Sequence, residues 1–562
     1  MKRYIAIYAM LTALPVSAQL DNTVEVTNEV KPVVTDVKKV DVKTQAAETK
    51  VKHYTMEYAV NGQRLTTYVA EPLSDYRSEA VWKGNKRGYL HLAGGNVGNL
   101  DGQLGYQFDF SDANALGIDL SLQGFNGKAK DNAHYAIYDW KSRDYRNRAA
   151  LKFSHAFGNG SEFYAKGAFE NRMFNYMGYF PTLDINAPAT DVDALTDKQH
   201  NVLGKFEVGL TPYTTGKFTL NASAGVDFFS QKYMTNLSDK LGETFFHANA
   251  GIAYEAADNH SIGLGLEFVS SDYGDVEIDG ITRLRLTPHY IYNDDNMQLQ
   301  LGVFVNTKGE VAPDVRFAYH ISRNSDVYVE ARGYEDDNNL RRLSGIHPYF
   351  VLDALANGEK KELEAEFHQI DARLGYRFKT NSGFSGNING GFDYSKNAAD
   401  IDALYGTADK PILYPWIDFS RNRRFYANAD FAYAYKGIVK IDAKNALSME
   451  SGEHIDKWIS GSYIVPAFEM KWSADVRIVR GLYFGLNWEF ATYTTPDLPL
   501  DGVLYDRPNT ANLGANLRYT LPIDMPLTLF VKGDNLLNQK YDRYFGYHYI
   551  GANFLAGIAM SF

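Results

Sequence analysis

The chain has 562 residues, a net charge of −11, 40 Tyr, 47 Gly and no Cys. The negative charge argues against nucleic acid as a partner, and the missing Cys excludes a disulfide framework, a thiolate metal site and a lipidated N-terminal Cys. The mean hydropathy of −0.35 is too polar for a bundle of membrane helices, but it does not exclude a β-barrel, whose strands alternate apolar and polar residues.

The N-terminus has the three regions of a secretory signal. Lys2 and Arg3 precede an apolar run from Tyr4 to Leu14, and Val16-Ser17-Ala18 supplies the small residues of a cleavage site. Residues 1–18 are therefore predicted to be a signal peptide. No later stretch is apolar for 18 consecutive residues, so we expect no membrane-spanning helix.

Residues 19–86 are predicted to form a periplasmic or lumenal extension. Aromatic residues are absent from Leu20 to His53, where Val alternates with Thr and charged residues, and this indicates an extended, poorly packed segment. Asn61-Gly62 then separates two strand-like runs, Tyr54 to Val60 and Gln63 to Ala70. This pattern predicts a β-hairpin.

From residue 87 to residue 562 the sequence alternates apolar and polar residues in segment after segment. Ile370, Ala372 and Leu374, for example, share one face of a strand, while Asp371 and Arg373 share the other. One face suits lipid and the other suits water, so residues 87–562 are predicted to form a transmembrane antiparallel β-barrel of about 22 strands, an all-β fold.

Two observations weaken individual strands of this prediction. Pro288 lies inside a predicted strand, where its missing N–H is poorly tolerated. The first strand, near Tyr89, is short.

The connections between predicted strands fall into a short and a long class that alternate. If the last strand ends in the periplasm, the short class should be periplasmic turns and the long class extracellular loops. The short ones are Phe157 to Gly160, Glu255 to Asn259, Tyr292 to Asn296, Ser322 to Asp326, Lys379 to Gly383 and Arg477 to Gly481. The long ones are Asn126 to Asp144, Asn175 to His200, Ser230 to Glu243, Tyr334 to Glu366, Asn397 to Asn422, Leu447 to Pro466, Thr494 to Pro508 and Asn535 to Gly551.

Charged residues of both signs recur on the predicted inner face of the wall. They include Glu267, Arg283, Arg285, Arg373, Arg377, Glu469 and Asp475. Two interpretations are open: ion pairs that hold the barrel and its filling together, or a polar path for conduction.

The predicted long loops carry aromatic residues that are candidates for ligand binding. They include Trp140, Tyr179, Tyr349, Trp416, Trp458 and Tyr544. Aromatic rings on loops can stack on sugars or anchor a partner protein. Rings at the membrane interface, or rings that pack loop against loop, have the same residue types.

No catalytic motif is present. The 13 His are scattered, without a His-Glu-x-x-His motif or a nucleophile elbow, so we expect neither an enzyme nor a bound cofactor or metal. The acidic run Glu335-Asp336-Asp337 is open to two interpretations, a Ca²⁺ site in a loop or a solvated edge.

The C-terminus has the features of a closing barrel strand. Phe554, Ala556, Ile558, Met560 and Phe562 share one face, and the chain ends on that Phe. This strand follows the run Asn535-Leu536-Leu537-Asn538-x-x-Tyr541 and the pair Gly546-Tyr547. Together they resemble the C-terminal signature of TonB-dependent outer-membrane receptors, although Gly551-Ala552-Asn553 stands where that family usually has Gly-Arg.

The resemblance implies a receptor-type barrel but not the plug domain of that family. Only about 65 residues precede the first strand after the signal, and they lack the Gly-rich core of such a domain. Residues 21–26 loosely resemble the segment that engages the energising partner. Because an empty barrel of this size would leak, the hairpin at Tyr54 to Ala70, an infolded loop such as Tyr334 to Glu366, or a partner protein should fill the lumen.

We therefore expect a Gram-negative outer-membrane barrel for the passage or surface docking of a polar ligand. The alternative is a non-transporting barrel subunit of an envelope assembly or surface-display complex, and an outer-membrane enzyme comes third. The expected partners are outer-membrane lipid and lipopolysaccharide, the barrel-insertion machinery, and a periplasmic protein or lipoprotein.

Overall fold

The computed structural model describes residues 87–127, 142–175, 198–232, 240–274, 278–348, 350–352, 361–407, 410–454, 457–494, 507–523, 527–544 and 547–562. Contacts divide the chain into residues 1–62 and residues 63–562, and every described residue belongs to the second unit. The predicted signal peptide and the predicted hairpin at residues 54–70 lie outside the described residues.

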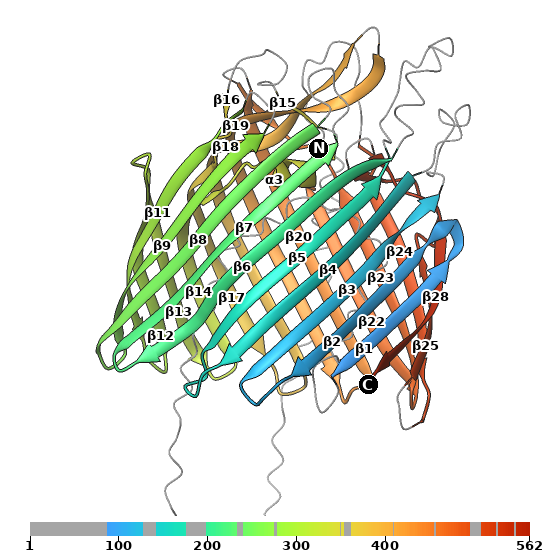
Figure 1. The fold of residues 1–562 in the computed structure, drawn as a ribbon, viewed down its shortest axis with the longest axis horizontal. Helices are drawn as coiled ribbons and strands as arrows, with labels where there is room; N and C mark the ends of the chain where they lie inside the picture. Colours follow the sequence, from blue (N-terminus) through green and yellow to red (C-terminus); the bar gives the residue numbers. More distant parts are fainter. Residues whose placement is uncertain are drawn as a thin grey trace, which may run out of the picture. The chain divides into compact units, whose positions relative to one another are not determined.

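Long antiparallel strands form a closed wall (Figure 1), and 22 of them can be traced in the described part of the chain. They are β1 (Gly88–Gly95), β2 (Leu100–Asp109), β3 (Asn114–Gly127), β4 (Ser142–Ala156), β5 (Glu162–Phe174), β6 (Gln199–Thr215), β7 (Phe218–Lys232), β8 (Lys240–Ala257), β9 (His260–Gly274), β11 (Ile281–Asn293), β12 (Met297–Asn306), β13 (Val311–Ser322), β14 (Ser325–Asp336), β17 (Glu366–Lys379), β18 (Phe384–Thr407), β19 (Lys410–Tyr435), β20 (Val439–His454), β22 (Phe468–Val479), β23 (Leu482–Thr492), β24 (Thr510–Thr520), β25 (Leu527–Asp534) and β28 (Asn553–Ser561). The predicted fold class and strand number are confirmed.

Smaller elements lie in the connections. They are the 3₁₀ turn η1 (Asn96–Gly98), the helix α3 (Leu340–Ile346) and the short strands β10 (Ile278–Asp279), β15 (Val351–Leu352), β16 (Lys361–Glu362), β21 (Lys457–Ser460), β26 (Asp542–Tyr544) and β27 (Tyr547–His548). Within the described ranges, no helix is long and apolar enough to cross a membrane.

The last strand closes the barrel against the first. In the antiparallel β1–β28 pair, Tyr89 lies opposite Ser561 and Gly95 opposite Leu555. The Phe562 N–H donates to the Gly88 carbonyl at 2.9 Å, and the Gly88 N–H donates to the Phe562 carbonyl at 2.8 Å. A Cβ at Gly88 would lie 2.6 Å from the Phe562 ring, so the ring covers the glycine. The predicted closing role of the last strand is confirmed, and the first strand near Tyr89 is present as the 8 residues of β1.

The outer face of the wall is apolar, as the alternation predicts. Leu374 is 58% exposed and Phe206 is 52% exposed although both lie within long paired strands. On the same strand as Leu374, Arg373 lies on the opposite side and pairs with Glu330. A closed barrel with such an exposed apolar belt is a membrane-spanning structure, and its place is the outer membrane.

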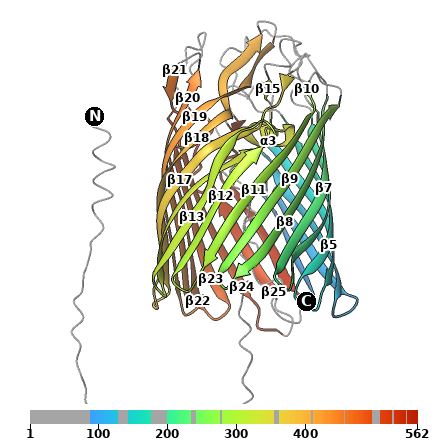
Figure 2. The ribbon, with the colours of Figure 1, turned by 90° about the vertical axis from the view of Figure 1, so that its left-hand side faces the viewer.

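The short connections lie where predicted. Tight turns join β4 to β5, β8 to β9, β11 to β12, β13 to β14, β17 to β18 and β22 to β23, all at the end of the barrel where β1 begins and β28 ends. Figure 2 shows this end at the bottom. The six predicted turns are confirmed.

The opposite end differs from the prediction in two ways. Among the connections that the structure describes in full there, those from Asn96 to Asn99 after β1 and from Thr307 to Glu310 after β12 are short, so the strict alternation of short and long classes is wrong. The predicted loop from Asn397 to Asn422 is instead a continuation of β18 and β19, which pair from Ala398 with Ser420 up to Thr407 with Lys410. Bulges interrupt this pairing and mask the alternation in the sequence.

Pro288 is accommodated inside β11. It lies opposite Leu264 of β9, but the pairs with β12 stop at Leu286 and resume at His289. The missing N–H therefore costs pairing on one side only.

Candidate functional site

The connection from β14 to β17 enters the barrel. We call residues 337–365 the infolded loop, of which the structure describes 337–348, 350–352 and 361–365. Its helix α3 begins at the N-cap Asn339, whose side-chain oxygen accepts from the Arg342 N–H at 2.8 Å. Figure 2 shows α3 inside the outline of the wall.

The infolded loop is packed against opposite parts of the wall. Its side chains share one buried apolar cluster with β6 to β9 on one side and with β18 and β19 on the other: Leu203, Phe229, Leu241, Tyr273, Ile278, Leu340, Leu343, Phe350, Leu352, Leu363, Ala399 and Ile417. The loop therefore crosses the lumen. The prediction that the Tyr334 to Glu366 connection contributes to filling the lumen is confirmed.

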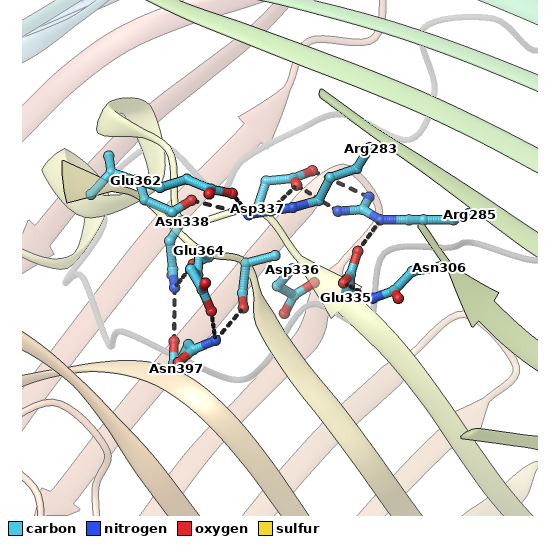
Figure 3. Close-up of polar contacts among 12 residues, drawn as sticks. Arg283, Arg285, Asn306, Glu335, Asp336, Asp337, Asn338, Glu362, Glu364 and Asn397 are labelled. Carbon is cyan, nitrogen blue, oxygen red and sulfur yellow. Dashed lines mark hydrogen bonds and ion pairs between the residues drawn. The ribbon is translucent and has the colours of Figure 1, made fainter. Parts of the chain in front are cut away.

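Two buried arginines of β11 hold both ends of the infolded loop (Figure 3). Arg285 donates from Nε to Glu335 at 2.6 Å and from Nη1 to Glu267 at 3.0 Å, and it also binds Asp337. Arg283 donates from Nη2 to the Leu363 carbonyl at 3.3 Å and lies 3.4 Å from Glu362. The predicted inner-face charges Arg283, Arg285 and Glu267 thus belong to one network, which we call the arginine latch.

A second set of polar contacts ties the loop ends to β18. The Asn338 side chain donates to the carbonyls of Glu364 at 2.8 Å and Asn397 at 2.7 Å, and the Asn397 side chain donates to the Glu364 carboxylate at 2.9 Å. Figure 3 shows these three residues facing one another. Lys308 donates to Glu364 at 2.8 Å, and this hydrogen bond lowers the pKa of the Glu364 carboxyl group.

The acidic run at the start of the loop is not a solvated edge. Glu335 and Asp337 both bind Arg285, and Glu335 also accepts from the Asn306 side chain. The sequence could not reveal this contact because β11 and the acidic run are about 50 residues apart in the chain.

The helix end of the loop is held by Asp227, which the sequence places among the inward-facing charges, and by Asn201 and Gln231, which it does not single out. Arg341 pairs with Asp227 of β7, and Asn201 of β6 donates to the Ser344 hydroxyl at 2.9 Å. Gln231 of β7 donates to the Pro348 carbonyl. The loop is therefore fixed by polar contacts on both sides of the lumen.

The connection from β25 to β28, described at residues 535–544 and 547–552, packs against β3 of the wall. Tyr541, Tyr549 and Ile550 form a buried cluster with Phe125 of β3. The Tyr544 ring lies 5.9 Å from the His347 ring of the infolded loop, so the two connections meet. We call residues 535–552 the C-terminal loop.

A buried carboxylate holds the C-terminal loop to the wall. Asp144 of β4 contacts three guanidinium groups: Arg543 of the C-terminal loop at 2.5 Å, Arg172 of β5 at 2.8 Å and Arg146 at 3.5 Å. Asp144 and Arg543 have fully buried side chains. None of these four residues was a sequence candidate, since alternation does not distinguish a buried cluster from a solvated inner face.

The other predicted lumen charges lie in pairs along the wall. Arg373 donates to Glu330 at 2.7 Å, Arg377 to Asp326 at 2.8 Å, Lys471 lies 2.8 Å from Glu469, and Arg518 lies 2.8 Å from Asp475. The Arg373 and Arg377 pairs join the adjacent strands β17 and β14, the Lys471 pair lies within β22, and Arg518 of β24 reaches Asp475 of β22 across β23. None of these four pairs includes a residue of the infolded loop.

The predicted loop aromatics have different surroundings. Trp140, Tyr179 and Tyr349 lie outside the described residues, and Trp416 is described only through its backbone in β19. Trp458 is half-buried, with the Arg423 guanidinium 3.6 Å from its ring centre. Tyr544 is 3% exposed and lies within 5.2 Å of the Arg172 guanidinium, which is packing of loop against wall rather than exposure on a loop.

No family model and no curated protein matches this sequence. Solved structures do match. The FrpB iron transporter from Neisseria meningitidis has a TM-score of 0.66 at 10% identity, over 86% of this chain and 82% of that chain. The ferric enterobactin receptor PfeA from Pseudomonas aeruginosa has a TM-score of 0.63 at 11% identity, over 85% and 80%. The ferric-catecholate import receptor Fiu from E. coli K12 has a TM-score of 0.58 at 10% identity, over 85% and 82%.

At such low identities the likeness is one of fold. The matched structures are TonB-dependent receptors with a 22-strand barrel, and they are transporters or receptors rather than enzymes. The protein is thus an integral outer-membrane β-barrel with the fold of these receptor barrels.

Proposed function

We propose that this barrel docks a polar ligand at the cell surface and passes it through a lumen that its own infolded loop closes. The observation that carries the proposal is the arginine latch, in which Arg283 pairs with Glu362 and Arg285 pairs with Asp337, so that side-chain ion pairs hold the loop. Ion pairs and hydrogen bonds can exchange partners with a polar ligand or with water, so such a closure is suited to opening. The matched FrpB iron transporter supports a transport role.

The wall below the loop is suited to a polar ligand. Paired charges such as Arg373 with Glu330 and Arg518 with Asp475 line it at intervals. Trp458 is the described loop aromatic best placed to contact a ligand, because it is half-buried and its strand β21 lies in an extracellular connection. A barrel of this kind needs the insertion machinery and contacts outer-membrane lipid and lipopolysaccharide. The proposal includes no plug domain and no TonB coupling.

Single-channel conductance in planar bilayers tests whether the infolded loop closes the lumen and can open. Arg285→Gln removes the charge that binds Glu335 and Asp337, so we expect openings that the wild-type barrel lacks. Arg377→Gln is the matched control, because Arg377 pairs with Asp326 and does not contact the loop. A triple variant adds Asn201→Cys and Ser344→Cys to Arg285→Gln. Linking its two cysteines with a short bifunctional thiol reagent should suppress the openings. The chain has no Cys of its own to interfere.

The second candidate is a non-transporting barrel subunit of an envelope or surface-display complex. It is favoured by the buried apolar cluster that joins the loop to both sides of the lumen, because such packing suits a permanent seal. If the barrel stays sealed both in Arg285→Gln and after deletion of residues 19–86, the scaffold role is supported and the transport role is contradicted.

A further inference from the structure

Three potential metal ligands meet at the neck of the infolded loop. Asp336 ends β14 and lies opposite Glu366, the first residue of β17, while His368 lies two residues further along β17 and on the same face as Glu366. One ligand atom from each of the three residues lies within 4.8 Å of the other two. The two strand ends that carry the loop therefore bring a nitrogen and two carboxylate oxygens together.

The His368 ring is held in the orientation that a metal ligand needs. Its Nδ1 lies 2.7 Å from the Asp393 carboxylate, and the Tyr334 ring stacks on it at 4.2 Å. The side chain is fully buried, and Nε2 has no hydrogen-bond partner. When the ring is neutral, a carboxylate on Nδ1 favours the tautomer with a proton on that nitrogen, and the Nε2 lone pair can then bind a metal ion.

Nε2 points at the two remaining carboxylates. It lies 3.3 Å from Glu366 Oε1 and 3.7 Å from Asp336 Oδ2. Atoms bonded to Zn²⁺ at about 2.0–2.1 Å stand about 3.3–3.4 Å apart in a tetrahedron, so these separations are close to those of a metal-bound set. Asp336 is the partly exposed member, with 24% of its side chain exposed, and it offers a route for an ion and a water ligand.

We propose that Asp336, Glu366 and His368 bind a divalent transition-metal ion of the Zn²⁺ type, with water as the fourth ligand. One imidazole with two carboxylates suits Zn²⁺ rather than Ca²⁺ or Mg²⁺, which prefer oxygen ligands alone. The ion joins β14 to β17 where the infolded loop leaves the wall, so it acts as a staple at the loop's neck. The site does not depend on whether the barrel conducts.

The charged groups around the site have a net negative charge, which a bound cation would compensate. Arg342 pairs with Glu366, and Arg424 lies 3.2 Å from Asp393. Two guanidinium groups face the three carboxylates of Asp336, Glu366 and Asp393, so with a neutral imidazole one negative charge is uncompensated. The competitor for Nε2 is a proton, which would make His368 an imidazolium held by the same carboxylates. The experiment must separate these two occupants.

Metal binding by the full-length barrel in detergent provides the test. After chelator treatment and desalting, Zn²⁺ alone is added, and the bound metal is measured by mass spectrometry. We expect a single tightly bound Zn²⁺ per chain and, with Co²⁺ as a probe, the visible absorption of a tetrahedral site. Asp336→Asn, a nearly isosteric change at a partly exposed position, should abolish this binding, and Asp336→His should retain it. Asp393→Asn should weaken it by about 10- to 100-fold.

Asp101→Asn is the matched control. Asp101 lies 3.0 Å from the buried His91, a second His–Asp pair that has no place in the proposed site, so this variant should bind Zn²⁺ like the wild type. Heat-modifiable migration in gels shows that each variant is folded. Bound Zn²⁺ should also slow hydrogen exchange in residues 340–346 of the wild type but not of Asp336→Asn.

Two outcomes overturn the proposal. If the folded wild type binds neither Zn²⁺ nor Co²⁺, His368 is an imidazolium in a buried ion cluster. If folded Asp336→Asn binds Zn²⁺ as tightly as the wild type does, the metal lies elsewhere. Neither outcome bears on conductance, so failure of the metal site and failure of the transport proposal are distinguishable.

Discussion

Neighbouring residues of one strand face different solvents, and Leu486 and Asn487 in the middle of β23 show this directly. Both are exposed, but Leu486 lies on the apolar outer face and Asn487 on the polar inner face. Leu486→Arg places a charge in lipid and should destabilise the barrel by about 2–4 kcal/mol near the midplane, whereas Asn487→Arg should be mild. Urea unfolding in lipid vesicles measures both, and equal losses would contradict the assignment of faces.

Asp144 has a buried carboxylate that holds the C-terminal loop to the wall. Among the contacts of that loop, its loss should lower the free energy of unfolding most. Asp144→Asn leaves Arg146, Arg172 and Arg543 facing one another without a counter-charge and should lower the free energy of unfolding by about 3–5 kcal/mol. Adding Arg543→Met should restore part of this loss because it removes the fully buried guanidinium. Unfolding in urea checks both variants, and no recovery in the double variant would mean that Arg543 is not the main repelling group.

The closing strand β28 is the element on which the whole wall depends. Deleting Phe562 removes two backbone hydrogen bonds to Gly88 and the ring that covers this glycine, so we expect lower outer-membrane levels. Ile558→Asp and Met560→Asp place a charge on the same outer face and should mimic the deletion, while Ala559→Ser should not. Immunoblots of outer-membrane fractions measure the levels. Normal levels without Phe562 would show that closure does not need it.

A β-bulge decides which side chains of β17 face the lumen. His368 and Leu374 are both even-numbered and should share a face, yet His368 is fully buried beside Asp393 and Leu374 is 58% exposed. The pairs with β14 shift between Tyr334–His368 and Arg332–Asp371, which inserts one extra residue into β17. A bulge reverses the facing of every residue beyond it. Strict alternation would therefore have placed His368 in lipid.

The two ends of the barrel carry different connections, and labelling each end tests how the whole molecule is oriented in the membrane. Engineered Asn159→Cys lies in the tight turn after β4, and Lys240→Cys lies at the start of β8 at the opposite, loop-bearing end. We expect a membrane-impermeant maleimide to label Lys240→Cys on intact cells and Asn159→Cys only after lysis. Because the native chain has no Cys, the background is clean. Labelling of Asn159→Cys from outside would invert the proposed orientation.

The sequence by itself determined the barrel. Alternation with a period of two is a local property of each strand, and it was sufficient for the fold class, the strand number, the six tight turns and the closing role of Phe554 to Phe562. Pairing of the inner-face charges was also open to sequence reasoning, because inward residues of adjacent strands must lie side by side.

Only the tertiary structure decided how the lumen is closed and which polar residues meet there. The arginine latch joins β11 to residues 50 to 80 positions later, and the proposed metal site joins Asp336 to Glu366 and His368 across a whole loop. No spacing motif records such contacts, because the path of the loop sets them. The bulge in β17 adds a second reason: one extra residue reverses the pattern from which the sequence would assign faces, and only the strand pairing reveals it.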